Sequence, residues 1–338
     1  MKALSHPPLN PKEIELSAPL TQIIDRFSKA NILVIGDLML DRFIWGKVNR
    51  ISPEAPVPVV HVTRESDHLG GAANVVSNIR ALGAGSTPIG MIGEDKAGTR
   101  LMEAFAANGV DAGGLVSKVN YPTIEKTRII AAHQQIVRVD REELQPLSAQ
   151  SLEELKASIA KHLPQADAII VSDYGKGVIT PELLMFLQEQ AGDALVCVDP
   201  KDKNFQHYRN AHIITPNQSE AERMSGVTIT DEASLRQAAQ TIFTSLNCQR
   251  LLITRGEHGM ALFNSPEDMI AIPTLAREVF DVSGAGDTVI ATYTVARAVG
   301  ATPHQAALLA NAAGGVVVGK LGTATLTAQE LKEAVAHL

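Results

Sequence analysis

Residues 168–176 read AIIVSDYGK, and this stretch carries the pattern that decides the fold. A run of small and apolar residues ends directly in the polar cluster Asp173–Lys176. Similar runs, separated by longer helical patterns, occur at 32–36, 195–199, 212–215 and 251–254. Short apolar strands that alternate with helices are typical of a parallel sheet buried on both faces. The sequence therefore predicts an α/β fold with a mostly parallel central sheet flanked by helices.

Two stretches interrupt this alternation, PVPVVHVTRE at 56–65 and TIEKTRIIAAHQQIVRVD at 123–140. Both are rich in β-branched residues and partly alternating, and neither contains a long helix. We interpret them as two excursions, spanning about 44–64 and 115–140, that form one small antiparallel β-sheet lid. Two separate edge hairpins are the alternative interpretation.

We expect the chain to consist of an N-terminal extension and one main domain. Four prolines fall within the first 20 residues, so we expect residues 1–30 to form an N-terminal extension. Residues 31–338 are expected to form the main domain, which carries the β-lid.

The composition of the 338 residues narrows the class of protein. A hydrophobic content of 45% is sufficient for a large core, and the formal net charge of -7 disfavours nucleic-acid or membrane-surface binding. Cys197 and Cys248 form no disulfide framework, and no CxxC or HExxH zinc motif occurs. The N-terminus lacks a signal-peptide pattern, and no run of eighteen apolar residues is present. We therefore expect a soluble, cytoplasmic protein.

Polar side chains follow each of the five predicted strands at the point where the strand ends. They are Asp37 and Asp41; Asp173 and Lys176; Asp199 and Lys201; Asn217 and Glu220; and Arg255, Gly256 and Gly259. In open parallel sheets, ligands bind beyond the carboxyl ends of the strands. Five such clusters at one sheet edge predict a single elongated site, long enough for a nucleotide and a small substrate.

The strongest single motif is DVSGAGDT at 281–288, which immediately precedes an apolar helical stretch. Gly284, Ala285 and Gly286 allow backbone N–H groups to converge at a helix N-terminus, where partial positive charge binds anions. This arrangement is suited to the charge on a transferring phosphoryl group. Asp287 follows directly, where a carboxylate accepts the proton of an attacking hydroxyl. Considered in isolation, Asp287 is equally consistent with a helix-capping acid.

Three weaker motifs each have a structural explanation as well as a functional one. Asn217 and Glu220 are expected to share one face of a helix, as phosphate and magnesium contacts or as a solvated first turn. GGAAN at 70–74 opens another helix, either for close approach to a ligand or as a tight turn. GGVVVGK at 314–320 has P-loop spacing, but Leu321 stands where Ser or Thr should hold magnesium.

Taken together, these motifs resemble a known enzyme family. GGAANVVSNIRALGA at 70–84 and DVSGAGDT at 281–288 are similar to the two signature regions of the ribokinase-like (PfkB) sugar kinases. The resemblance covers nearly all of the chain after residue 30. It implies a ribokinase-like fold, ATP and Mg²⁺ as cofactors, and K⁺ as a candidate further ion.

The resemblance also implies a role for individual residues. Asp287 would be the catalytic base, and Gly284, Ala285 and Gly286 the anion hole. Nucleotide contacts would come from Asn217, Gln218, Ser219, Glu220, Thr254, Arg255, Gly256, Gly259 and Asn311, with Glu220 directed to magnesium. A monovalent cation would be held by Asp281, Ser283, Lys320 and Gly322. The sugar would be held by Asp37, Asp41, Gly70, Gly71 and Asn74, with Asp173 beside them.

Five further stretches resemble the branch of the family that acts on heptose 7-phosphate: 50–60, 172–180, 199–201, 215–220 and 318–325. That likeness implies phosphorylation of the anomeric O1 of heptose 7-phosphate, in ADP-heptose supply for lipopolysaccharide. In many bacteria such a kinase is the first half of a bifunctional protein, and this sequence is expected to be a stand-alone kinase. A kinase for another sugar or nucleoside, and a catalytically silent sugar-binding regulator, remain as alternatives.

A sugar phosphate partner requires local cations in this acidic protein. Lys176 and Lys201 at strand ends, and Arg138 in the second excursion, are the candidates, together with Arg50. Each also has a simpler explanation, as a contact to ATP or as a partner of an acid. We further expect a homodimer formed through the β-lid.

Overall fold

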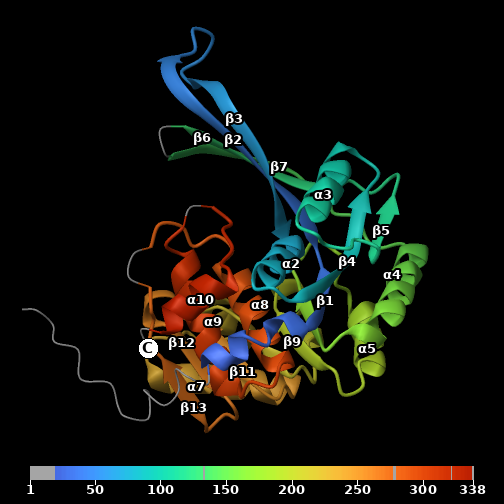
Figure 1. Ribbon diagram of the computed structural model, residues 1–338, viewed down its shortest axis with the longest axis vertical. Helices are drawn as coiled ribbons and strands as arrows, with labels where there is room; N and C mark the ends of the chain where they lie inside the picture. Colours follow the sequence, from blue (N-terminus) through green and yellow to red (C-terminus); the bar gives the residue numbers. More distant parts are fainter. Residues whose placement is uncertain (1–19, 132–133, 277–278, 321, 337–338) are drawn as a thin grey trace, which may run out of the picture.

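The center of the fold is a nine-stranded, mostly parallel sheet (Figure 1). The computed structural model describes residues 20–131, 134–276, 279–320 and 322–336. The strand order is β13-β12-β11-β10-β9-β8-β1-β4-β5, in which all neighbours from β11 to β5 pair in parallel and β12 and β13 form an antiparallel edge. The strands are β1 Asn31–Gly36, β4 Gly85–Gly93, β5 Leu115–Lys118, β8 Ala168–Ser172, β9 Leu195–Asp199, β10 Ile213–Ile214, β11 Leu251–Thr254, β12 Met260–Phe263 and β13 Met269–Ile272. The predicted parallel sheet is confirmed, and each of the five predicted apolar runs contains one of its strands.

Helices cover both faces of this sheet, and the strand residues alternate between the two resulting cores. Ile32 and Val34 of β1 belong to the core beneath α2, α3, α8, α9 and α10, whereas Leu33 and Ile35 belong to the core beneath α4, α5, α6 and α7. This alternation explains why β1 is a continuous apolar run. The helices are α2 Ala72–Ala81, α3 Lys96–Ala107, α4 Ala149–His162, α5 Pro181–Gln190, α6 Gln218–Ser225, α7 Glu232–Leu246, α8 Ala285–Ala298, α9 Pro303–Val317 and α10 Ala328–Val335. Short 3-10 helices are η1 Phe27–Lys29, η2 Leu163–Gln165, η3 Asp202–His207 and η4 Gly256–His258.

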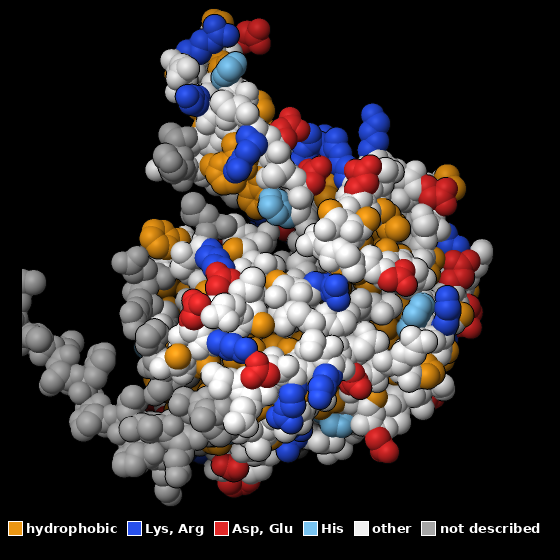
Figure 2. Space-filling view, in the orientation of Figure 1, with side chains coloured by type: hydrophobic (Ala, Val, Ile, Leu, Met, Phe, Trp, Pro, Cys, Tyr) orange, Lys and Arg blue, Asp and Glu red, His pale blue; other side chains and the backbone are white. Residues whose placement is uncertain are grey.

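A second sheet of four strands, which we call the lid sheet, projects from one end of the main domain (Figures 1 and 2). Its order is β3-β2-β6-β7, with β2 Leu38–Ile51, β3 Pro58–Gly71, β6 Ile124–Ala131 and β7 Gln134–Arg141. The two excursions therefore form one sheet rather than two separate hairpins. The predicted antiparallel pairing is confirmed within each hairpin, whereas β2 and β6 join the two hairpins in parallel.

The observed strands also shift the predicted lid boundaries of 44–64 and 115–140. The first excursion extends over β2 and β3, because both strands continue into the main domain with buried ends at Leu38 and Gly71. Residues 115–118 form β5 and pair with β4 at the edge of the main sheet. The second part of the lid sheet therefore begins at Ile124.

The N-terminal extension and the start of helix α6 differ from the sequence prediction. Residues 1–19 of the predicted extension lie outside the described residues, whereas Leu20, Ile23 and Phe27 are buried in the main core. The pattern TPNQ predicts a cap at Thr215 with Pro216 as first helical residue, and this prediction is wrong. Asn217 caps α6 instead, and its backbone N–H and side chain form a capping box with Glu220.

Helix α6 ends at Gly226, whose left-handed conformation, with φ of 71°, is a common C-terminal cap. Among the helices of the part of the chain described here, none is long and apolar enough to cross a membrane.

Candidate active site

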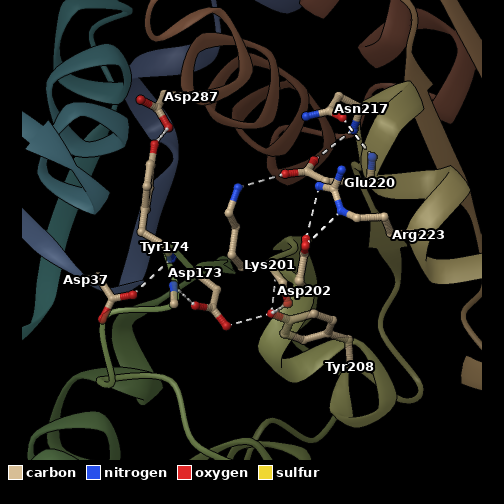
Figure 3. Close-up of polar contacts among 11 residues, drawn as sticks. Asp37, Asp173, Tyr174, Lys201, Asp202, Tyr208, Asn217, Glu220, Arg223 and Asp287 are labelled. Atoms are coloured by element: carbon tan, nitrogen blue, oxygen red, sulfur yellow. Dashed lines mark hydrogen bonds and ion pairs between the residues drawn. The ribbon is translucent and has the colours of Figure 1, made fainter. Parts of the chain in front are cut away.

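The carboxyl ends of the central strands surround a cavity of about 140 Å³. Its lining includes Asp173, Asp199, Lys201, Glu220, Gly286 and Asp287. These residues follow β8, β9 and β10 or begin α6 and α8, so the fold brings together clusters that are far apart in the sequence. Figure 3 shows four of them, Asp173, Lys201, Glu220 and Asp287, which come from different elements.

Asp287 lies in the first turn of α8 and is 5% exposed. Its Oδ2 accepts a hydrogen bond of 2.6 Å from Nδ2 of Asn74 in α2, and its Oδ1 accepts one from the hydroxyl of Tyr174. Both bonds come from other elements, and Gly284, the residue before α8, makes no side-chain cap. The carboxylate is therefore oriented by the site, and it is not engaged as a cap of its own helix.

Burial raises the pKa of Asp287 to about 6, while the hydrogen bonds from Tyr174 and Asn74 hold it lower than burial alone would. The nearby Asp41 carboxylate adds to the increase. An ordinary aspartate with a pKa near 4 is a poor proton acceptor, whereas a carboxylate with a pKa close to neutral is better matched to general base catalysis. Asp287 is thus ionised at neutral pH and able to accept a proton.

The turn before Asp287 brings backbone N–H groups to the same cavity. Gly284 has φ of 79°, and a β-carbon there would lie 2.8 Å from Nδ2 of Asn74, so a side chain is disfavoured on two grounds. The first N–H groups of a helix have no partner within the helix. Gly284 and Gly286 line the cavity, which places the predicted anion hole beside Asp287.

Asp37, predicted to hold the sugar, is buried and bonded to the protein itself. Its oxygens accept backbone N–H bonds of 2.9–3.0 Å from Tyr174, Lys176 and Val178. Burial raises its pKa, and the three N–H donors oppose this increase. The carboxylate therefore shapes the loop that carries Tyr174 toward Asp287, and its direct contact with a sugar stays a prediction.

Asp173 has a similar structural environment. Its oxygens accept bonds of 2.6 Å from the Tyr208 hydroxyl, the Asn204 side-chain amide and the Gly175 N–H. These contacts tie the loop after β8 to η3. Figure 3 shows Tyr174 extending from this loop to Asp287, while Asp173 turns toward Tyr208.

Asn217 and Glu220 are joined by the capping box, and Glu220 also pairs with Lys201 at 3.2 Å. Gln218 donates to the carbonyl of Ile229, and Ser219 is exposed on the same first turn. Asp199 is half-buried and lines the same cavity as Asn217 and Glu220. Burial is the main cause that raises its pKa well above the usual range, and the neighbouring Asp287 and Glu220 carboxylates add to it. This end of the cavity concentrates negative charge that a cation would neutralise.

A larger and more apolar pocket of about 650 Å³ continues from the cavity, and Thr254 and Gly286 line both. It contains the predicted nucleotide residues Arg255, Gly256, Gly259 and Asn311, together with Val279, Val282, Val289 and Val318. Gly259 has φ of 74°, and a β-carbon there would lie 2.1 Å from the Ile272 carbonyl oxygen. Asn311 in α9 is fixed by a bond to the Pro273 carbonyl. An apolar slot with few polar groups at its edges suits a planar base.

Three of the four residues predicted to hold a monovalent cation lie together. Oδ1 and Oδ2 of Asp281 accept the backbone N–H groups of Ser283 and Gly322, so these three residues form one turn structure. Lys320, in contrast, directs its Nζ to the Thr325 carbonyl and Glu330, so its side chain points away from that turn.

At the sugar end, the predicted residues Gly70, Gly71 and Asn74 lie where β3 enters α2. Gly71 has φ of 57°, and a β-carbon on Gly70 would lie 2.6 Å from Oδ2 of Asp41. Asp41 pairs with Arg128 of β6 at 2.5 Å. The backbone therefore passes close to Asp41, which favours glycine here.

Three of the four candidate phosphate-binding cations are paired with carboxylates. Lys176 pairs with Glu142, Arg138 with Asp140, and Lys201 with Glu220 on the nucleotide side. Arg50 lies exposed near the far end of β2.

Sequence reasoning gave no individual role to three residues that the structure places at or beside the site. Tyr174 contacts Asp287, Arg128 pairs with Asp41, and Asp199 lines the cavity. Asp199 and Tyr174 stand at or just after the ends of strands, and this position in the sequence could have identified them as site residues. For Arg128, the signal was the alternation of cations in Lys126-Thr-Arg128, which predicts one charged face on a strand.

The P-loop alternative fails on local structure. Gly314–Val317 lie within the C-terminal part of α9, so they form no phosphate-binding loop between a strand and a helix.

The mostly parallel sheet, the buried Asp287 carboxylate beside a glycine turn, and the adjoining apolar pocket agree with a carbohydrate kinase of the ribokinase-like class. The pfkB family of carbohydrate kinases matches residues 29–330, and this chain belongs to that family. It is accordingly an ATP-dependent sugar kinase.

Curated relatives agree with this assignment. The bifunctional protein HldE of Trichlorobacter lovleyi is 48% identical over 93% of this chain, and that of Geobacter metallireducens is 46% identical over 89%. The matches cover 64% and 62% of those proteins, so this chain spans less than two thirds of their length.

Solved structures show the same fold at low sequence identity. Phosphofructokinase-2 from Escherichia coli in complex with potassium superposes with a TM-score of 0.76 at 19% identity, over 91% of this chain and 98% of that one. Ribokinase of Arabidopsis thaliana complexed with ribose and ATP gives 0.70 at 20% identity, over 90% and 98%.

Proposed function

We propose that this kinase transfers the γ-phosphoryl group of ATP to the anomeric O1 of D-glycero-D-manno-heptose 7-phosphate, yielding the 1,7-bisphosphate. The observation that carries the proposal is the match to HldE proteins at 44–48% identity across the family region. The role would be supply of ADP-heptose for lipopolysaccharide, and the cytoplasm, where ATP is made and used, would be its location.

The site supports in-line transfer to a hydroxyl. Asp287 is buried, ionised at neutral pH and oriented by Tyr174 and Asn74, so it would accept the proton of the attacking hydroxyl. The N–H groups at Gly284–Gly286 would face the negative charge that develops on the transferring group. Phosphoryl transfer depends mainly on such positioning and charge stabilisation.

The nucleotide end fits ATP with Mg²⁺. The 650 Å³ pocket is large enough for adenosine, and it opens to the cavity where the phosphates would meet Gly286. Among the residues described, no group of three or more His, Cys, Asp or Glu side chains is arranged to hold a metal by itself. A magnesium ion would be held largely by phosphate oxygens and water, with Glu220 and Asp199 as acidic neighbours. Bound Mg²⁺ would neutralise charge on the phosphates.

The monovalent site is a further proposal. Ser283 directly precedes Gly284 of the anion hole, and the turn that it forms with Asp281 and Gly322 would hold K⁺ through oxygen atoms. Turnover measured in KCl and in tetramethylammonium chloride at equal ionic strength tests it, since a K⁺-dependent enzyme is slow in the second salt.

An ATP-consumption assay across a panel of sugars tests the main proposal. The panel contains heptose 7-phosphate, heptose, fructose 6-phosphate, fructose, ribose and adenosine. We expect heptose 7-phosphate to have the highest kcat/KM. A preference for another acceptor would leave only the general sugar kinase assignment, and no ATP use with any acceptor would favour the silent regulator.

We also propose a homodimer formed through the lid sheet. Val137 and Val139 of β7 are 45% and 43% exposed, and their register with Ile129 and Thr127 places them on the face opposite Lys126. An exposed apolar sheet face is a common association surface. Light scattering at working concentration would exclude this proposal if it gave the mass of a monomer.

A further inference from the structure

One face of the lid sheet carries positive and negative side chains in alternation. Two of them, Lys126 and Arg128, are not among the residues predicted to hold the sugar. Directly paired residues on neighbouring strands share a face. Asp41 of β2 pairs with Lys126 of β6, which pairs with Asp140 of β7, and in the next row Arg128 pairs with Arg138. Lys126, Arg128 and Arg138 therefore stand on one surface with two carboxylates.

This face is directed at the active site. Asp41 is close enough to influence the pKa of Asp287, and Arg128 that of Asp281. A β-carbon on Gly322 would lie 3.8 Å from the ring of Phe43, which shares the face. Asp41 also acts electrostatically on Lys126. Asp41 is therefore within electrostatic range of both Asp287 and Lys126.

The cations of this region differ in whether they have a partner. Arg128 pairs with Asp41, Arg138 binds both oxygens of Asp140, and Lys176 pairs with Glu142 at 2.6 Å. Lys126 has no ion-pair or hydrogen-bond partner for its amine among the residues that the structure describes. It is nevertheless only partly exposed.

Lys126 is half-buried, and the two carboxylates of its row, Asp41 and Asp140, are bonded to Arg128 and Arg138 instead. Partial burial is the main cause that lowers the pKa of Lys126, and the positive charge of Lys176 lowers it further. Lys126 belongs to the lid sheet, whereas Lys176 belongs to the loop after β8 of the main domain. Two like charges facing each other across this boundary repel, and an anion with two negative charges between them would reverse the interaction.

We propose that Lys126, together with Lys176 and Arg138, binds the phosphate that the sugar already carries. The inference rests on the proposed function and specifies its substrate selectivity. Of the cations expected from the sequence, Lys201 is engaged with Glu220 on the nucleotide side and Arg50 lies far out on the lid, so neither belongs to this set. Because the phosphate bridges lid and main domain, it also favours closure of the lid over a phosphorylated sugar.

The test compares wild type with Lys126→Ala on heptose 7-phosphate and on unphosphorylated heptose. We expect kcat/KM for heptose 7-phosphate to fall about 10- to 100-fold, which is typical for loss of a hydrogen bond to a charged group. The KM for ATP and kcat/KM for heptose should change less than about two-fold. Lys126→Arg, which keeps the charge, should recover most of the loss.

Lys47→Ala is the matched control, because Lys47 is an exposed cation of the same lid sheet, six residues beyond Asp41 on β2. It should leave every constant unchanged. Lys126→Gln provides a second variant of similar size, and thermal melts of all variants report folding. An equal loss on both sugars, or no loss on either, would overturn the proposed phosphate site.

The outcomes separate this inference from the proposed function. If wild type prefers heptose 7-phosphate and Lys126→Ala retains that preference, the phosphate site is wrong and the function stands. If wild type prefers another sugar phosphate and Lys126→Ala loses it, the phosphate site stands and the heptose assignment fails. A wild-type preference for an unphosphorylated sugar rejects both.

Discussion

The main sheet holds its functional polar groups in buried surroundings, whereas the lid sheet exposes them to solvent. Every residue of β8 is buried, and the carboxylates beyond the main strands are held by short bonds from other elements, as Asp287 is by Asn74. Every residue of β7 is exposed, and its Arg138 pairs with Asp140 in solvent. Groups fixed by burial are suited to chemistry, which needs a preset geometry. Groups with exposed, exchangeable partners are suited to recognition that is completed by a ligand.

The largest expected effect comes from replacing Asp287, the buried carboxylate that is proposed to act as the base. Asp287→Asn keeps the size of the side chain but lacks the charge that accepts a proton. We expect kcat to fall roughly 10²–10⁴-fold, with the KM for ATP nearly unchanged. Steady-state kinetics with ATP and the sugar phosphate measure both constants.

Asp193→Asn is a suitable control, because Asp193 is exposed and remote from the cavity that contains Asp287. It should behave as wild type. If Asp287→Asn retained near wild-type kcat, the reaction would not depend on this carboxylate, and the buried edge would lose its assigned role.

The same comparison predicts unequal effects on stability. Ile170 of β8 is fully buried, so Ile170→Ala should lower the free energy of unfolding by about 2–5 kcal/mol. Val139 of β7 is 43% exposed, so Val139→Ala should change it by less than about 0.5 kcal/mol. Urea denaturation followed by circular dichroism gives both values. Similar losses in the two variants would show that the lid is packed as tightly as the main sheet, for example in a dimer.

The main sheet was predictable from sequence for the same physical reason that makes it rigid. Strands buried on both faces must be apolar throughout, so runs such as 32–36 and 168–172 stand out. Because ligands bind beyond the carboxyl ends of such strands, the position of Asp173 and Asn217 could also be predicted. The glycine motif at 284–286 marked the helix that carries Asp287.

Other features depend on contacts that no local pattern encodes. Residues 115–118 have the β-rich texture of the lid, and only their pairing with β4 assigns them to the main sheet. The parallel pairing of β2 with β6 is likewise a tertiary choice. Tyr174 is recognisable as a strand-end residue, but its bond to Asp287 joins positions far apart in the chain. The unpaired state of Lys126 becomes visible only when its neighbours are known.

The smallest expected effect concerns the pKa of the base, and it tests how far the buried contacts tune the chemistry. Asp287 is active as a base when ionised, so kcat/KM of the wild type should fall as the pH drops through about 6. The Tyr174 hydroxyl stabilises the ionised form, so Tyr174→Phe should raise the pKa and move this midpoint to higher pH. At pH 8 both enzymes hold Asp287 ionised, and their rates should differ by no more than a few-fold. Tyr208→Phe is the matched control, because Tyr208 bonds to Asp173 rather than Asp287 and should leave the midpoint in place. A midpoint that is equal in wild type and Tyr174→Phe would mean that burial alone sets the pKa, and that the bond from Tyr174 only orients the carboxylate.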